Sequence, residues 1–190
     1  MILPILCLFL LLTPVLSEPY RYYLRAKSPS NTSTLNEDLS SLYLASSMTF
    51  NGHTNYVLLS PSDNAQPLNL YAGDGSITLD TTNVIGASSQ APVLLSNNSG
   101  LNNVYKQVIL GDQMAGRYTK GFRINAASNE LGLQKEGFGG FVACTAAKGF
   151  KQLHWFEEGA VEAEGVPVTC EEVEFQRVWY ANETGAAGQD

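Results

Sequence analysis

The chain has 190 residues, a formal net charge of −7 and 44% hydrophobic residues. Its acidity argues against a nucleic-acid surface, which needs a patch of Lys and Arg to neutralise phosphates, and against an anionic membrane. The length suits one domain with its own hydrophobic core.

An apolar run opens the chain, and no charged side chain occurs before Glu18. The run is shorter than the roughly 20 apolar residues that cross a bilayer, and residues 15–17 resemble a cleavage site. We therefore expect a signal peptide at residues 1–17, with an uncleaved anchor as the alternative, and a secreted, extracellular mature protein. A single all-β domain is expected at residues 18–180, followed by a flexible polar tail at 181–190 without the hydrophobic end of a GPI signal.

Short stretches with period-two alternation, separated by Gly, Pro, Asn and Ser, recur along the chain. They predict strands at residues 22–26, 42–45, 56–59, 68–71, 76–79, 92–95, 105–110, 121–124, 131–133, 141–144, 152–156 and 173–179. One helical turn could form within residues 35–44, and residues 157–165 are expected to be an acidic loop. This pattern predicts an all-β fold: a closed, β-trefoil-like barrel or, as the alternative, a two-sheet β-sandwich.

A faint internal repeat favours the trefoil-like form. Residues 23–26, 122–126 and 141–144 each begin with an aromatic side chain and end with a small one. Each is followed by a polar turn and another predicted strand, as expected for a barrel of repeated hairpins.

Cysteines and sequons fit an exported protein. Cleavage removes Cys7, and the two remaining cysteines in an oxidising compartment have one intramolecular connectivity. We expect a disulfide between Cys144 and Cys170. Glycosylation sequons at Asn31, Asn97 and Asn182 are expected in surface loops.

Several segments together resemble a known family. They are Tyr-Tyr-Leu-Arg-Ala-Lys at residues 22–27, Leu-Tyr-Leu-Ala-Ser at 42–46, Phe-Gly-Gly-Phe-Val-Ala-Cys at 138–144, Gln-Leu-His-Trp at 152–155 and Pro-Val-Thr-Cys-Glu-Glu-Val at 167–173. The pattern resembles a family of small secreted fungal proteins of uncharacterised function. The resemblance covers nearly all of the mature chain and implies export, an all-β fold and the same disulfide. It carries no catalytic residue to transfer.

Four residues near the end of the chain are candidates for ligand binding: Trp155, His154, Glu157 and Glu158. A tryptophan could stack on a sugar ring, and carboxylates beside a histidine could catalyse acid–base chemistry on a glycosidic bond. Each also has a simpler interpretation. The tryptophan would be a core residue, the histidine a partly exposed strand residue, and the carboxylates part of a solvated loop that keeps an edge soluble.

No motif indicates catalysis, a metal or a cofactor. The Gly-x-Ser-x-Gly motif of hydrolases is absent, and the glycines at residues 137–140 lack the lysine and helix of a phosphate-binding loop. We expect those glycines to permit a bulge or a close backbone approach. No catalytic residue, metal site or cofactor is expected.

The leading hypothesis is a secreted, non-enzymatic binding protein directed at carbohydrate, a cell-wall component or an extracellular protein, with no nucleic-acid or membrane partner. The oligomeric state stays open. One alternative is a glycan-directed hydrolase that uses Glu157 or Glu158 with His154. Another is a passive matrix protein.

Overall fold

The computed structural model describes residues 21–29, 39–48, 55–81, 90–101, 104–112, 114–146 and 149–179. Within these ranges the chain forms strands β1 (Tyr22–Lys27), β2 (Leu42–Met48), β3 (Asn55–Pro61), β4 (Leu68–Leu70), β5 (Ile77–Asp80), β6 (Gln90–Leu101), β7 (Tyr105–Leu110), β8 (Phe122–Ile124), β9 (Leu131–Leu133), β10 (Phe138–Thr145), β11 (Lys151–Glu157) and β12 (Cys170–Trp179). Two 3-10 turns, η1 (Leu39–Ser41) and η2 (Ser62–Asn64), and the helix α2 (Ala160–Glu164) complete it. None of these helices has the length and hydropathy to cross a membrane.

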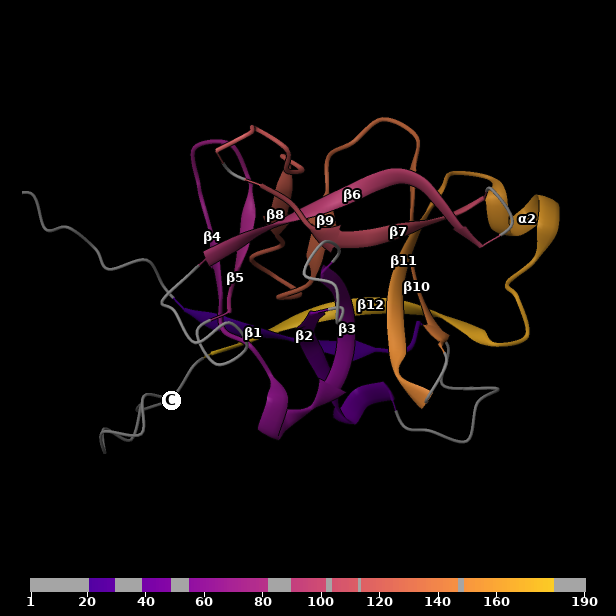
Figure 1. Cartoon of the computed structure of the whole chain (residues 1–190), viewed down its shortest axis with the longest axis horizontal. Helices are drawn as coiled ribbons and strands as arrows, with labels where there is room; N and C mark the ends of the chain where they lie inside the picture. The colour runs from indigo at the N-terminus through magenta and orange to yellow at the C-terminus, as the bar shows by residue number, and fades with distance from the viewer. Residues whose placement is uncertain are drawn as a thin grey trace, which may run out of the picture.

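The strands close into an antiparallel barrel of nine strands, as expected from the sequence. The ring runs from β12 through β1, β4, β5, β6, β7, β3, β11 and β10 and back to β12. The strand β2 pairs with both β1 and β3. In Figure 1, the indigo β1 and the yellow β12 lie side by side although they are the first and last strands.

The pairing pattern repeats three times, which makes the barrel a β-trefoil arrangement. The first unit comprises β1 to β4, the second β5 to β8 and the third β9 to β12. The middle strands of each unit form a hairpin, namely β2–β3, β6–β7 and β10–β11. The third strands of the units pair with one another in a triangle of β3–β7, β7–β11 and β11–β3. The sandwich alternative is therefore not the fold.

The register of this triangle follows the same three-fold rule. Val57, Val108 and Leu153 are equivalent buried core residues of β3, β7 and β11. In each contact, the residue before the core residue of one unit faces the residue after the core residue of the next. The three pairs are Tyr56 with Ile109, Gln107 with His154, and Gln152 with Leu58.

Apolar side chains from equivalent strands meet at the centre of the barrel. The triplets that line this centre are Leu24, Ile77 and Leu131; Leu44, Val93 and Phe141; and Val57, Val108 and Leu153. Alternation along each strand places these side chains inside and the intervening ones outside. The same alternation leaves the outer face free to vary among the units.

Two local expectations need correction. Residues 160–164 form a helix rather than a loop, because Ala160 and Val161 pack on a hydrophobic cluster outside the barrel. The helical turn expected within residues 35–44 is a 3-10 turn at Leu39–Ser41, and β2 then begins at Leu42. Residues 35–38 lie outside the described ranges.

The expected bulge is present in β10. The register with β11 shifts between Phe138 and Gly140. A Cβ atom on Gly139 would lie 2.8 Å from the backbone carbonyl carbon of Glu157, so this close approach requires glycine.

Candidate functional site

Trp155 lies inside the fold. It is 0% exposed, and its indole nitrogen donates a 2.9 Å hydrogen bond to the carbonyl of Ser96. The ammonium groups of Lys106 and Lys135 lie 4.8 Å and 4.6 Å from the ring centroid, within cation–π range. In this conformation the ring has no exposed face on which a sugar could stack.

The other three candidates do not converge. His154 and Glu157 lie on opposite faces of β11, because side chains alternate along a strand. The imidazole is 3% exposed, its Nδ1 lies 3.3 Å from the carbonyl oxygen of Gln152, and burial lowers the pKa of His154. The exposed Glu157 is ion-paired with Lys106, whose hydrogen bond and charge lower the pKa of that carboxyl group. Glu158 is exposed in the turn before α2, so no acid–base pair is formed here.

The disulfide between Cys144 and Cys170 is present and joins β10 to β12. Both cysteines belong to a second hydrophobic cluster outside the barrel, with Tyr105, Val142 and Phe156. Ala160, Val161 and Val166, from the segment of residues 159–166 that includes α2, pack on this cluster. We call this segment the third-unit plug.

The first unit has an open groove of about 350 Å³ on its outer face. Its walls come from β2, β3 and the η2 turn, and Phe150, in the turn before β11, lines one side and is 55% exposed. Ala45 and Leu58 supply buried apolar surface. The polar lining residues are Ser46, Ser47, Ser60, Asp63, Asn64 and Gln66. We call this site the first-unit groove.

Gln66 shapes the wall of the first-unit groove. Its side chain is 4% exposed and accepts a 2.9 Å hydrogen bond from the hydroxyl of Ser46, while its backbone N–H donates to the carbonyl of Leu44 at 3.3 Å. Asp63 is exposed and accepts a 3.3 Å hydrogen bond from Ser62. No cation pairs with Asp63 within the part of the chain that the structure describes. Its carboxylate can therefore accept bonds from a ligand.

The three-fold arrangement relates this groove to the third-unit plug. Phe150, just before β11, and Tyr105, at the start of β7, each lie three residues before a core residue. Ser60 and Phe156 likewise lie three residues after a core residue, in β3 and β11. The buried Tyr105 and Phe156 lie beneath the third-unit plug, whereas the exposed Phe150 and the polar Ser60 line the open first-unit groove.

A second groove of about 430 Å³ lies between the β4–β5 turn and β8. Tyr71 lines it and is 41% exposed. The carboxylate of Asp74 is already engaged: it accepts a 2.9 Å bond from the backbone of Ser76 and lies 3.5 Å from the ammonium of Lys120. Hydrogen bonds from the side chain and then the backbone of Ser76, together with the charge of Lys120, lower the pKa of Asp74. This β4–β5 turn groove therefore offers a ligand less free polar chemistry.

Sequence reasoning did not single out Phe150, Asp63 or Gln66. Phe150 lies far along the chain from Asp63 and Gln66, and no local motif joins it to them. Of the expected glycosylation sites, Asn97 is exposed on β6, and Asn31 and Asn182 lie outside the described residues. The described residues include no group of three or more His, Cys, Asp or Glu that could hold a metal ion.

A family model described as a domain of unknown function (DUF7907) matches residues 19–179. The chain therefore belongs to this family. No curated protein and no solved structure matches the chain.

Proposed function

We propose that this member of the family is an exported, non-enzymatic binding module that holds a neutral carbohydrate in its first-unit groove. One observation carries the proposal: an exposed aromatic ring, Phe150, lines a single groove together with the carboxylate of Asp63, which has no ion-pair partner among the described residues. The apolar start of the chain supports export. The disulfide is compatible with an oxidising compartment.

The chemistry of the groove matches that of a sugar. A pyranose ring has an apolar C–H face, for which Phe150 and Leu58 offer apolar surface, and a rim of hydroxyl groups. Those hydroxyls can donate to the carboxylate of Asp63 in charge-assisted bonds and exchange bonds with Asn64. The carboxylate disfavours sulfated or uronic glycans by like-charge repulsion. The groove volume lies within the range of about 300–1,000 Å³ usual for small-ligand sites.

A glycan array followed by calorimetry of the tightest ligand tests the proposal. Phe150→Ala is expected to weaken binding at least about tenfold, because it removes the aromatic contact. Asp63→Asn is expected to weaken it about five- to tenfold, because a charge-assisted bond becomes a neutral one. The matched control is Tyr71→Ala, which removes an exposed aromatic side chain from the β4–β5 turn groove and should leave affinity unchanged.

Three outcomes would contradict the proposal. If none of the neutral glycans on the array binds, the proposed carbohydrate-binding function is wrong. If Tyr71→Ala loses affinity and Phe150→Ala does not, the ligand lies in the β4–β5 turn groove instead. Release of sugar from a polysaccharide panel, abolished by Glu157→Gln, supports the hydrolase hypothesis instead.

A further inference from the structure

The core-facing side of β12 changes from apolar to charged as the strand leaves the barrel. Val173 and Phe175 are 3% and 1% exposed and belong to the core. Alternation places Arg177 and then Trp179 on the same side. Arg177 lies directly opposite Leu24 of β1, which is fully buried. The charged guanidinium of Arg177 therefore follows the buried apolar side chains on this side of β12.

The guanidinium of Arg177 has few partners among the described residues. Arg177 Nη2 donates a 2.5 Å hydrogen bond to Asn129 Oδ1, and the guanidinium carbon lies 4.2 Å from the ring centroid of Trp179. Its Nε is buried and has no hydrogen-bond partner among the residues that the structure describes. Among the residues described, no carboxylate lies within ion-pair distance of it. Because arginine has five N–H donors and a permanent charge, one amide oxygen and one ring compensate it poorly.

Tyr22 brings a second buried donor to the same end of the barrel. It is 4% exposed, and its ring packs edge-on against Trp179 with centroids 6.4 Å apart. Within the described ranges its hydroxyl has no hydrogen-bond partner. Burial raises the pKa of Tyr22, and the charge of Arg177 offsets part of that rise. The hydroxyl therefore stays neutral at physiological pH. Both orphaned groups are donors, so the partner that would satisfy them is an acceptor.

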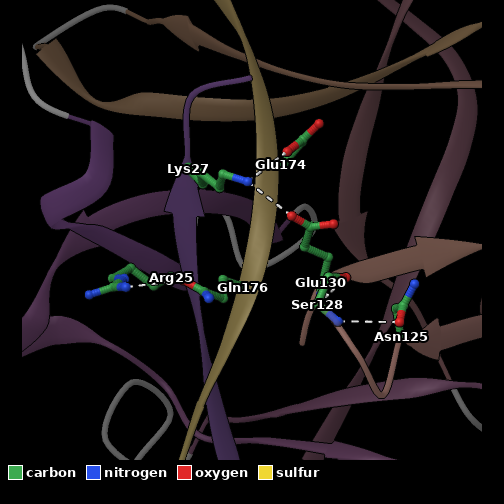
Figure 2. Close-up of polar contacts among 7 residues, drawn as sticks. All are labelled: Arg25, Lys27, Asn125, Ser128, Glu130, Glu174 and Gln176. Carbon is green, nitrogen blue, oxygen red and sulfur yellow. Dashed lines mark hydrogen bonds and ion pairs between the residues drawn. The ribbon is translucent and has the colours of Figure 1, made fainter. Parts of the chain in front are cut away.

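The acceptor of the Arg177 bond is held by a strained turn. Asn129 has a φ of 58°, where the corresponding position of the β4–β5 turn has Gly75 with a φ of 69°. Glycine suits this conformation better, so asparagine supplies a side chain at some cost in strain. Figure 2 shows the ion pairs that fasten the turn: Lys27 contacts Glu130 at 2.9 Å and Glu174 at 3.6 Å. The turn thus fixes the orientation of the guanidinium.

We propose that the end of the barrel formed by Tyr22, Arg177 and Trp179 binds a carboxylate carried on a flat ring. The carboxylate accepts hydrogen bonds from Arg177 Nε and the Tyr22 hydroxyl, and its charge pairs with the guanidinium. The indole of Trp179, which is 53% exposed, packs on the ring of the ligand. Trp179 is the last residue of β12 and about half of it is exposed, so solvent reaches its ring. This site is separate from the first-unit groove.

Matched small acids test the proposal on the mature, disulfide-bonded chain. Benzoate carries both the carboxylate and the aromatic ring, benzamide lacks the charge, and acetate lacks the ring. Galacturonate tests whether a sugar acid binds in place of an aromatic acid. The readout is the pair of indole N–H signals in a 15N-resolved NMR spectrum, since the chain has two tryptophans. Benzoate should shift the Trp179 signal and leave that of the buried Trp155 in place. Benzamide and acetate should each bind at least about tenfold more weakly.

Two variants keep the proposal falsifiable if one of them unfolds. Arg177→Gln should reduce benzoate affinity to that of benzamide. Asn129→Gly suits the backbone conformation and should fold, yet it should weaken benzoate severalfold by releasing the guanidinium. Binding of galacturonate in place of benzoate would contradict a flat ring as the ligand. Equal binding of benzoate and benzamide, a shift of Trp155 alone, or unchanged affinity in both variants would overturn it.

Discussion

The hydroxyl of Tyr105 donates a 2.6 Å hydrogen bond to the backbone carbonyl of Gly165, the residue that ends α2. This bond fastens the third-unit plug to β7, a strand of the second unit. Tyr105 is 1% exposed and its ring packs edge-on against Phe156 at 6.0 Å. The bond explains how a five-residue helix with no side-chain cap is held in place.

Tyr105→Phe is expected to lower the free energy of unfolding by about 0.5–1.5 kcal/mol, the usual net value of one hydrogen bond. The ring packing is retained, so the loss should be local. Hydrogen exchange should speed up in residues 160–165 and stay unchanged in β3. An equal increase in exchange rate across the plug and the barrel, or no increase in either, would contradict the anchoring role.

The disulfide should contribute more than this bond, because it closes a loop between cysteines 26 residues apart. We expect Cys144→Ala combined with Cys170→Ala to lower the free energy of unfolding by roughly 3–4 kcal/mol in the chain-entropy account. Urea unfolding measures the difference. Reductant should bring the natural protein to the same level and leave the double variant unaffected. A loss below about 1 kcal/mol would show that strand pairing alone fixes β10 to β12.

Trp155 and Glu157 allow a direct comparison of a core role with a surface role. Trp155→Ala is expected to cost about 3–5 kcal/mol of stability because the ring is fully buried. Glu157→Gln should leave stability almost unchanged, since ion pairs on the surface contribute little. Thermal and urea unfolding check both expectations. A ligand-binding role for Trp155 would instead appear as lost affinity in the milder Trp155→Phe variant, with stability largely kept.

The strands and the closed barrel could be predicted because alternation is a local property, as in Tyr22–Lys27, where every second side chain is buried. The internal repeat that favoured the trefoil-like form was misassigned. Residues 23–26, 122–126 and 141–144 fall on β1, β8 and β10, which occupy different places in their units. The three-fold symmetry lies in pairings between residues that are distant in the sequence, such as Tyr56 with Ile109. The sequence shows only that the core positions next to these pairs are aliphatic.

The first-unit groove could not be predicted for the same reason. Phe150 reaches the groove only because β11 pairs with β3, and that pairing leaves no trace in the local sequence. Trp155 attracted attention as an aromatic residue in a strand, yet alternation does not tell a residue facing the core from one facing a cleft. The disulfide could be predicted because two cysteines in an oxidising compartment leave a single connectivity.

The buried His154 should make stability depend on pH in a defined direction. Burial lowers the pKa of the imidazole in the folded state, so the unfolded chain binds a proton at a higher pH than the folded chain. The stabilisation is therefore complete above the unfolded value of about 6.5 and is lost as the pH falls below it. The slope of the unfolding free energy should approach at most about 1.4 kcal/mol per pH unit, for one proton.

Urea unfolding of the natural protein and of His154→Gln between pH 7.5 and 5, values chosen to bracket about 6.5, isolates this contribution. The variant should show a flatter profile across that window. The carboxyl groups of Asp74, Glu130 and Glu157 have pKa values lowered by their hydrogen-bond partners, so they titrate at lower pH and affect both proteins alike. Parallel profiles above pH 5 would mean that the imidazole gains a proton as readily in the fold as in water, and that it is not held neutral by its burial beside β7 and β10.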